Sequence, residues 1–364
     1  MGVTKISGIA VSGIAKINGK TVSSYAKVDD QPLSNTPAPT VTLWGCAGAD
    51  GGVGWATGSS PTTWTGYRSP NTKDDHVHLG YGKDGSGGNI WVRTTSNNNN
   101  ELAWTDDIQT DGTWNLINVS GRRFKVKWAN DKWIAVGQVN QSDILTSSDG
   151  ASWGSVDISG LSGFSSTSMY GLATNGTSSW IMTQNDRVYG STDHGASWNL
   201  INDFNDSSKI WDAVYSTGYW FVFRTHAGGG GSNAEKISRA PVADWTSWTS
   251  TSDTGIGAAA KDFNAAVSTA SANYATVIVV NSNDIVRSTD SGATYSHLLN
   301  VLPYGSARAC AGDGQGNWVA THDDGRVSYS NDDGTTWAIG SSEITFDSGT
   351  EDIDTVAVNK YLPL

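Results

Sequence analysis

A short turn-like segment recurs along this chain, and it constrains the fold more than any other feature. Residues 191–198, 288–295 and 330–337 share the pattern Ser-x-Asp-x-Gly-x-Ser/Thr-aromatic, and residues 147–153 repeat it in a form one residue shorter. In turns, Asp and Ser side chains bond their own backbone, and Gly supplies a positive φ. A segment that recurs at a spacing of tens of residues indicates a repeat architecture built from small β-sheets.

Weaker copies extend the pattern to seven units. The closing aromatic residues are Trp64, Trp114, Trp153, Trp198, Trp248, Tyr295 and Trp337, which lie 50, 39, 45, 50, 47 and 42 residues apart. The copy at Trp64 has lost its Asp and Gly, the copy at Trp114 is shortened, and the copy at Trp248 keeps only the aromatic residue. Each unit has the length of four short strands, and the recurrent turn joins the third strand to the fourth.

The first unit is incomplete in a way that predicts how the repeats close. Counting back from Trp64, residues 43–48 and 53–57 are the second and third strands, and the first strand is missing. Residues 352–359 resemble a first strand with no unit after it. Closing the ring with this strand would hide both sheet edges. The sequence therefore predicts an all-β, seven-bladed β-propeller that is closed by its C-terminal strand.

The repeated turn resembles the Asp-box of sialidase-type propellers, a fold shared by sialidases, xyloglucan hydrolases, sortilin-type receptors and a photosystem assembly factor. This resemblance covers residues 41–364 and implies the fold rather than an activity, because the box serves a turn on the outer rim. Identical positions in identical turns give the box residues a structural role. They are Asp149, Asp193, Asp290 and Asp332, with Trp153, Trp198, Tyr295 and Trp337.

Charge and cysteine content exclude several classes of protein. The formal net charge of −12 disfavours binding to nucleic acid or to an anionic membrane. Cys46 and Cys310 make no disulfide framework and are interpreted as small buried side chains. We expect no secretory signal and no membrane insertion, so the protein is made in a cytoplasm.

A different repeat precedes the propeller. Lys5, Lys16 and Lys27 are 11 residues apart, and Asn18-Gly19 is a hairpin signal. We divide the chain into a β-rich N-terminal arm at residues 1–30, a Pro-rich linker at 31–40 and the propeller at 41–364. The arm is too short to bury its own core, so it needs a particle surface or other copies of itself. Its docking residues would be Ile6, Val11, Ile17, Val22 and Val28.

The arm repeat resembles the Lys-Ile-Asn-Gly-type repeats near the ends of bacteriophage tail and virion proteins. This resemblance implies a virion location and contacts with other virion proteins through the arm, and a homo-oligomer is compatible with it.

Partner-facing candidates lie on the face opposite the recurrent turns, at the second-to-third-strand turns and the connections between blades. Propellers commonly bind partners there, and loops carry function more often than the scaffold does. The candidates are Tyr67, Arg68, Asp186, Arg187, His226, Asp284, His322 and Asp323.

Evidence for catalysis is weak, and no catalytic residue, cofactor or metal is assigned. Tyr67 and Arg68 faintly resemble the Arg-containing tetrapeptide of sialidases, but they follow the first box instead of preceding it. A pair of carboxylates for glycoside hydrolysis stays open. His76 and His78 would share one face of a strand, yet no third ligand follows at a recognisable spacing, so a strand with two polar positions is favoured.

The sequence thus favours a bacteriophage structural protein, a capsid decoration or tail-associated protein whose propeller binds host surface glycan or protein. A glycoside hydrolase of surface polysaccharide and a protein-binding assembly factor remain the alternatives.

Overall fold

The computed structural model describes residues 42–48, 51–69, 76–95, 101–137, 142–165, 167–206, 208–226, 235–251, 276–341, 343–346 and 352–359. It also describes short strands at residues 16–17, 20–21, 27–28, 31–32, 265–266 and 349–350. The chain divides into two compact units, Met1–Val41 and Thr42–Leu364. In the described part, no helix is long and apolar enough to cross a membrane.

The first unit contains two short antiparallel pairs of strands. β1 (Lys16–Ile17) pairs with β2 (Lys20–Thr21), and β3 (Lys27–Val28) pairs with β4 (Gln31–Pro32). The predicted turn at Asn18-Gly19 falls between β1 and β2, but its two residues lie outside the described part, as do the side chains of all five predicted docking residues.

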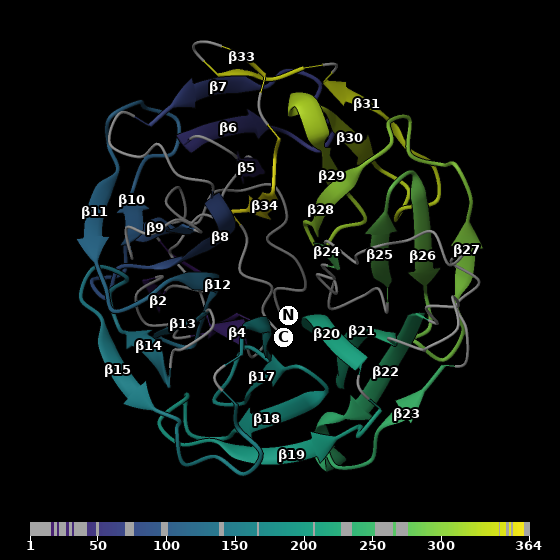
Figure 1. The fold of residues 1–364 in the computed structure, drawn as a ribbon. Coiled ribbons are helices and arrows are strands. Elements are labelled where there is room, and N and C mark those ends of the chain that lie inside the picture. The colour runs from purple at the N-terminus through teal and green to yellow at the C-terminus, as the bar shows by residue number, and fades with distance from the viewer. Residues whose placement is uncertain are drawn as a thin grey trace. The chain divides into compact units, whose positions relative to one another are not determined.

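The second unit is a ring of seven four-stranded antiparallel sheets (Figure 1). From blade two to blade four the strands follow chain order outward from the centre. They are β8 (His76–Lys83), β9 (Asn89–Thr95), β10 (Glu101–Thr105) and β11 (Asn115–Asn118); β12 (Arg123–Ala129), β13 (Lys132–Gly137), β14 (Asp143–Ser147) and β15 (Gly154–Asp157); and β16 (Met169–Thr174), β17 (Trp180–Gln184), β18 (Arg187–Ser191) and β19 (Asn199–Asp203).

Blades five to seven have the same order. They contain β20 (Ser208–Ser216), β21 (Tyr219–His226), β22 (Glu235–Pro241) and β23 (Thr249–Ser250); β24 (Ala265–Ala266), β25 (Val277–Asn281), β26 (Asp284–Ser288) and β27 (Ser296–Leu298); and β28 (Ala307–Gly312), β29 (Trp318–His322), β30 (Val327–Ser330) and β31 (Ala338–Ser341). The short helices η4 (Val242–Asp244) and η5 (Asp323–Gly325) and the hairpin of β32 (Thr345–Phe346) with β33 (Gly349–Thr350) lie between strands.

Blade one confirms the predicted closure. Its inner strand is β34 (Thr355–Val358), which pairs antiparallel with β5 (Leu43–Ala47) before β6 (Gly52–Thr57) and β7 (Thr65–Arg68) complete the sheet. The register places Thr355 opposite Ala47 and Val358 opposite Trp44. Both ends of the second unit therefore meet in one sheet, and the chain is a seven-bladed β-propeller.

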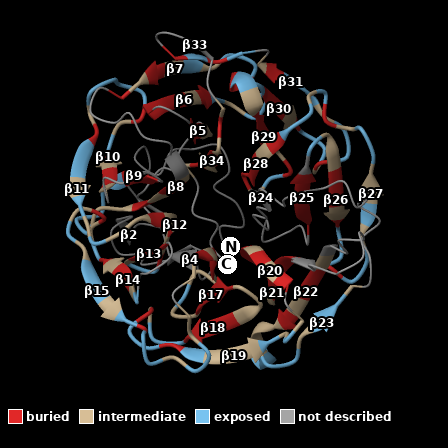
Figure 2. Ribbon diagram, in the orientation of Figure 1, coloured by how far each residue is buried: buried red, intermediate tan, exposed pale blue. Residues whose placement is uncertain are grey.

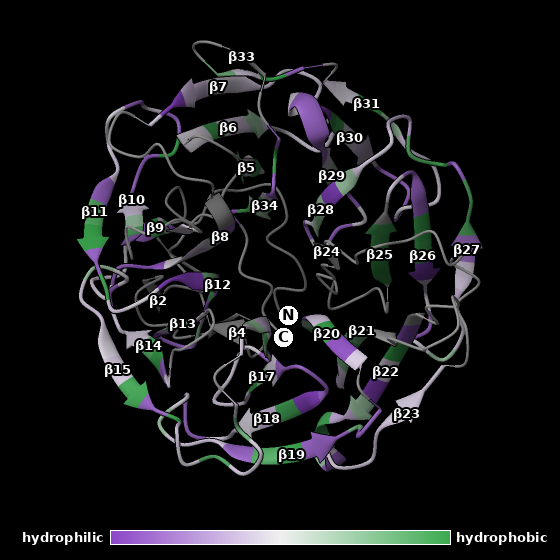
Figure 3. Ribbon diagram, in the orientation of Figure 1, coloured by the Kyte–Doolittle hydropathy of each residue, from purple (hydrophilic) through white to green (hydrophobic). Residues whose placement is uncertain are grey.

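Large side chains on the second strands form much of the core. Six of the seven second strands contain a buried Trp, and the seventh, β25, is apolar from Val277 to Val280 (Figure 3). These residues are Trp44, Trp91, Trp133, Trp180, Trp220 and Trp318. Burying an aromatic side chain removes roughly 150–250 Å² from water, worth about 4–6 kcal/mol as an upper bound. Buried residues concentrate on the middle strands, and the outer strands are mostly exposed (Figure 2).

Candidate functional site

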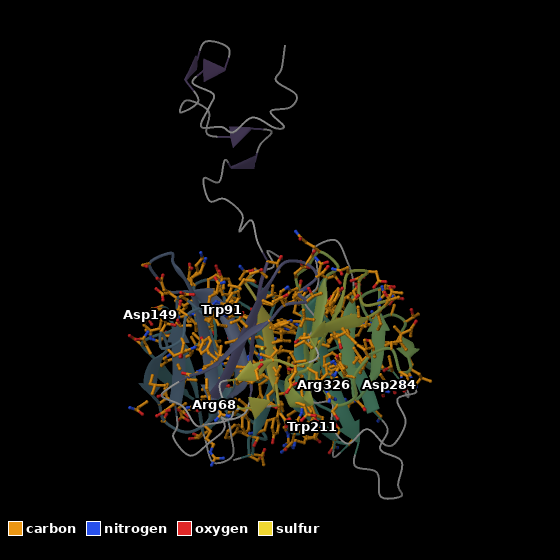
Figure 4. All side chains as sticks on the ribbon, turned by 90° about the horizontal axis from the view of Figure 1, so that it is seen from above. Arg68, Trp91, Asp149, Trp211, Asp284 and Arg326 are labelled. Atoms are coloured by element: carbon orange, nitrogen blue, oxygen red, sulfur yellow. The ribbon has the colours of Figure 1, made fainter. Side chains whose placement is uncertain are left out.

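The propeller has two chemically different faces. The first-to-second and third-to-fourth turns of each blade lie on one face, and the second-to-third turns and the connections between blades lie on the other. Figure 4 shows Asp149 towards the first face, and Arg68, Trp211, Asp284 and Arg326 towards the second. We call the first the turn face and the second the mouth face.

The recurrent turns on the turn face share one hydrogen-bond pattern. In the turn before Trp198, Ser191 Oγ donates to Asp193 Oδ1 at 2.8 Å and accepts from the Gly195 amide at 2.9 Å. Asp193 Oδ1 also accepts from the Ser197 amide at 2.9 Å, and the Trp198 indole donates to the Gly195 carbonyl at 3.0 Å. Equivalent Ser-to-Asp bonds occur at Asp149, Asp290 and Asp332. The four carboxylates are thus engaged within their own turns.

The glycines of the recurrent turns also allow close packing between neighbouring blades. Gly195 has a φ of 79°, and a Cβ there would lie 2.4 Å from Ile134 Cδ1 on the second strand of the preceding blade. Gly334 repeats this arrangement against Ile278 at 2.2 Å. A turn and a contact between blades therefore depend on the same residue, which explains why the pattern recurs.

The weaker copies keep the geometry with other residues. In the shortened turn before Trp114, the Asp107 carboxylate accepts from the Gln109 amide at 2.9 Å. In the copy before Trp248, which seemed to keep only its aromatic residue, the Asp244 carboxylate accepts from Thr246 Oγ1 at 2.7 Å. The indoles of Trp64 and Trp248 each donate to the carbonyl three residues earlier, as Trp198 does.

Asp193→Ala is expected to lower the free energy of unfolding by about 1 kcal/mol at neutral pH, because it removes hydrogen bonds of the turn. Burial raises the pKa of Asp193, but hydrogen bonds from Ser197 and Ser191 outweigh it and hold the pKa below its ordinary value of 3.8. Because the pKa of Asp193 is lower in the folded than in the unfolded state, its ionised carboxylate stabilises the fold at pH values above the ordinary pKa. This stabilisation is lost as the pH falls through the folded-state pKa. Denaturant unfolding of both proteins should therefore show a difference at pH 7 that shrinks below about pH 4. Asp193→Asn, which keeps one acceptor, is the control with the smaller effect.

Two of the predicted partner-facing residues lie in the interior. Tyr67 is 6 % exposed, and its hydroxyl donates to the Ile108 carbonyl at 3.0 Å and accepts from the Trp114 indole at 2.9 Å. His322 is fully buried between the Gly305 carbonyl and the Ser328 hydroxyl, and burial lowers its pKa to about 4. Both side chains pack the interior and do not face a partner.

The other predicted residues lie on several blades of the mouth face. Arg187 pairs with Asp203 at 2.9 Å, and a carboxylate oxygen of Asp284 lies 3.5 Å from His297 Nε2. Asp186 lies in the turn before β18, next to Arg187, and Arg68 ends β7. His226 ends β21, and its side chain lies outside the described part. Asp323 pairs with Arg308 on the inner strand β28.

Five of the seven inner strands, β8, β12, β16, β20 and β28, have a β-bulge close to their first residues. On β12, Arg123 pairs with Gly137 and Lys125 with Val136, so Phe124 is an extra residue. On β16, Tyr170 and Gly171 together stand opposite Thr183, and the same shift makes Trp211 extra on β20 and Arg308 on β28. A bulge re-aims the extra side chain away from the regular ladder. Four inner strands thus present a large side chain at equivalent positions on the mouth face.

Three of these side chains form a continuous aromatic layer across blades three, four and five. The rings of Phe124 and Tyr170 stack with centroids 5.3 Å apart and an interplanar angle of 8°, and Tyr170 meets Trp211 at 5.4 Å. The Lys209 ammonium lies 4.2 Å from the Tyr170 ring centroid and 3.4 Å from that of Trp211. All four side chains are partly exposed. We call Phe124, Tyr170, Trp211 and Lys209 the aromatic mouth.

A group of titratable side chains follows the bulges along the same inner strands. Lys125 Nζ reaches Asp212 Oδ2 at 2.9 Å, an ion pair from blade three to blade five that skips blade four. Gly171 occupies the equivalent position on the intervening strand, where a Cβ would lie 2.5 Å from Thr183 Oγ1. Burial lowers the pKa of Lys127 to about 8, although Asp212 raises it.

His78 belongs to this group. Burial and the nearby Lys125 and Lys127 hold its pKa well below the ordinary value, and its Nδ1 lies 3.5 Å from the Val126 amide. The register shifts between His76 and His78, so the regular alternation expected of the strand is interrupted there. Within the described residues, no three His, Cys, Asp or Glu side chains gather where they could hold a metal.

Across the mouth face, Arg308 is surrounded by carboxylates. It pairs with Asp323, with Asp352 at 2.9 Å and with Asp354 at 3.5 Å. Burial lowers the pKa of Arg308, but the hydrogen bond that Arg308 donates to Asp323 and the charges of Asp354 and Asp352 outweigh this effect and raise the pKa. The charge of the fourth bulge residue is therefore neutralised.

The aromatic mouth was not predicted from the sequence because its residues belong to strands and not to loops. A trace was nevertheless visible. Phe124 and Tyr170 each follow the buried residue that starts an inner strand, and Trp211 follows the buried Ile210. Aligning the seven units would place these large side chains in one column.

Comparisons with known proteins bear on the fold. No protein-family model and no curated protein matches this sequence. Among solved structures, the chain is similar to YCF48 bound to D1 peptide, with a TM-score of 0.54 and 10 % identity over 76 % of this chain and 84 % of that one. It is also similar to YCF48 from Cyanidioschyzon merolae, with a TM-score of 0.50 and 13 % identity over 72 % and 84 % of the two chains. A structure of the nidogen/laminin complex gives a TM-score of 0.49 at 12 % identity over 88 % and 98 %. At these identities the YCF48 likenesses show a shared fold.

Proposed function

We propose that this propeller is a binding module that holds a segment of a partner protein against the aromatic mouth. The observation that carries the proposal is the contiguous, partly exposed layer of Phe124, Tyr170 and Trp211, presented by three equivalent bulges. Aromatic side chains are enriched at binding hot spots because they bury a large area at a low entropic cost. A solved structure of the same fold, YCF48, is bound to a peptide, which supports the choice of a protein ligand.

Tyr170→Ala and Trp211→Ala are expected to weaken binding of a peptide selected on the wild-type protein by at least about tenfold each, because each removes a ring of the contact layer. The probe is a displayed library of random linear peptides, selected on the full-length protein and then measured as synthetic peptides by fluorescence polarisation. Ile339→Ala, which removes an exposed apolar side chain from the outer strand β31, is the matched control and should leave binding unchanged.

If no peptide is selected while a glycan array gives binding that Trp211→Ala abolishes, the mouth recognises carbohydrate and the protein-binding proposal fails. Release of sugar from surface polysaccharide would instead favour the glycoside hydrolase.

We propose further that the protein acts on a bacteriophage particle, as a capsid decoration or tail-associated protein whose propeller contacts host surface protein or glycan. The support is the 11-residue repeat of the arm and its resemblance to repeats of virion proteins. In this proposal Ile6, Val11, Ile17, Val22 and Val28 dock the arm onto the virion, and the recurrent turns are Asp-boxes.

Removing residues 1–41 is expected to leave a folded propeller that no longer joins particles, since the division at Val41 separates the arm from the propeller unit. Circular dichroism would follow the fold, and quantitative immunoblotting of purified particles would measure occupancy. Wild-type occupancy of the shortened protein would show that the arm does not dock it.

A further inference from the structure

The aromatic mouth lies beside an excess of positive charge, in a chain whose formal net charge is −12. Lys125 and Lys127 follow Phe124 on β12, and Lys209 precedes Trp211 on β20. The carboxylates nearby are already engaged. Asp212 pairs with Lys125, and Asp206 pairs with both Arg224 and Lys236.

Lys209 and Lys127 form no ion pair with any residue that the structure describes. Among the described side chains on these strands and in the ion pairs around them, five are cations (Lys125, Lys127, Lys209, Arg224, Lys236) and three are carboxylates (Asp186, Asp206, Asp212). The excess charge of these residues is opposite in sign to that of the whole protein.

The position of Lys209 restricts what could neutralise it. Its ammonium rests over the rings of Tyr170 and Trp211, which remove part of its hydration and hold it in place. An anion that pairs with Lys209 must therefore approach next to the aromatic layer. A ligand that also contacts Phe124 and Tyr170 needs an apolar or aromatic group directly beside its anionic group.

We propose that the segment bound at the aromatic mouth carries a carboxylate adjacent to an apolar or aromatic residue, with Lys209 as the partner of that carboxylate. This inference rests on the proposed function and adds the chemistry of the ligand. The carboxylate could belong to an Asp or Glu side chain or to the C-terminus of the partner. In either case it would meet an attractive local field on a surface that otherwise repels anions.

The test uses the full-length protein and a displayed library of random peptides with free C-termini. Peptides selected on the wild type should be enriched in Asp, Glu or a C-terminal apolar residue. Synthetic peptides in which the side-chain carboxylate is replaced by the amide, or the C-terminus is amidated, separate the two sources. The relevant replacement should weaken binding about tenfold or more, and raising the salt concentration should weaken the acidic peptide only.

Lys209→Gln should bind the acidic peptide and its amide counterpart equally. Lys132→Gln removes the same charge at the start of β13, next to the turn face, and should keep the full preference. Peptides that lose affinity in Trp211→Ala but show no preference for a carboxylate would overturn this inference and leave the proposed function standing. A preference that persists in Lys209→Gln would also overturn it, and selection of no peptide at all would defeat both proposals.

Discussion

A protein shortened by residues 351–364 is expected to lose cooperative folding of the whole propeller. The deletion removes β34, the inner strand of blade one, and exposes an edge of β5 inside the ring. It also removes Ile353, Val356 and Val358, which are at most 6 % exposed. Burying each such side chain is worth about 1.5–3 kcal/mol, so this loss approaches the 5–15 kcal/mol that typically stabilises a domain.

Differential scanning calorimetry with near-ultraviolet circular dichroism would measure this effect. A protein that lacks only residues 360–364 is the control, because it keeps the two bonds between Leu43 and Asn359 at 2.8 and 2.9 Å. A melting transition of the shortened protein at the full-length temperature would mean that blade one does not need its inner strand.

Arg224→Ala is expected to lower the free energy of unfolding by about 3–5 kcal/mol, the usual effect of removing one partner of a buried ion pair. Arg224 is 2 % exposed and contacts groups from all parts of blade five. It binds Asp206 at 2.8 Å and Ser208 at 3.2 Å before and on β20, Ser238 at 3.1 Å on β22 and Ser250 at 3.1 Å on β23. The Arg224 side chain therefore connects β20, β22 and β23 at the mouth-face end of blade five.

Arg187→Ala is the matched control, since it removes the same charge from an ion pair whose side chains are 26 % and 32 % exposed. Exposed pairs contribute about 0–1 kcal/mol, so denaturant unfolding should separate the two variants clearly. Similar losses for both would show that the buried network of Arg224 adds nothing beyond a surface pair.

The ring and its closure were predictable because they depend on repetition. The turn residues are imposed by local chemistry, since Ser191, Asp193 and Gly195 make their bonds within the turn itself. Residues 352–359 could be recognised as a first strand because the unit before Trp64 lacked one. These features need no knowledge of distant contacts.

Burial of individual polar residues was not predictable in this way. His322 ends a strand at a turn, a position that suggests exposure, yet the Gly305 carbonyl and Ser328 satisfy its ring in the interior. The Tyr67 hydroxyl donates a hydrogen bond to the Ile108 carbonyl and accepts one from the Trp114 indole, and both partners belong to the next blade. In both residues, contacts with segments brought close only by the fold decide the role of the side chain.

The aromatic mouth was missed for a related reason. A bulge adds a single residue to one strand, and a single sequence cannot show which residue is extra until the partner strand is known. Phe124, Tyr170 and Trp211 read as ordinary strand residues, although the register with β13, β17 and β21 shows where the shifts occur.

The bulges have a consequence for how such a surface can change. Because Phe124 and Trp211 are surplus to the regular pairing of their strands, the flanking ladder bonds do not depend on the identity of their side chains. Substitutions there alter what the ring presents to another molecule without altering what holds the ring together. A lineage could therefore exchange ligands through a few point mutations at the inner rim while the seven sheets stay the same, and a protein engineer could randomise these positions for the same purpose.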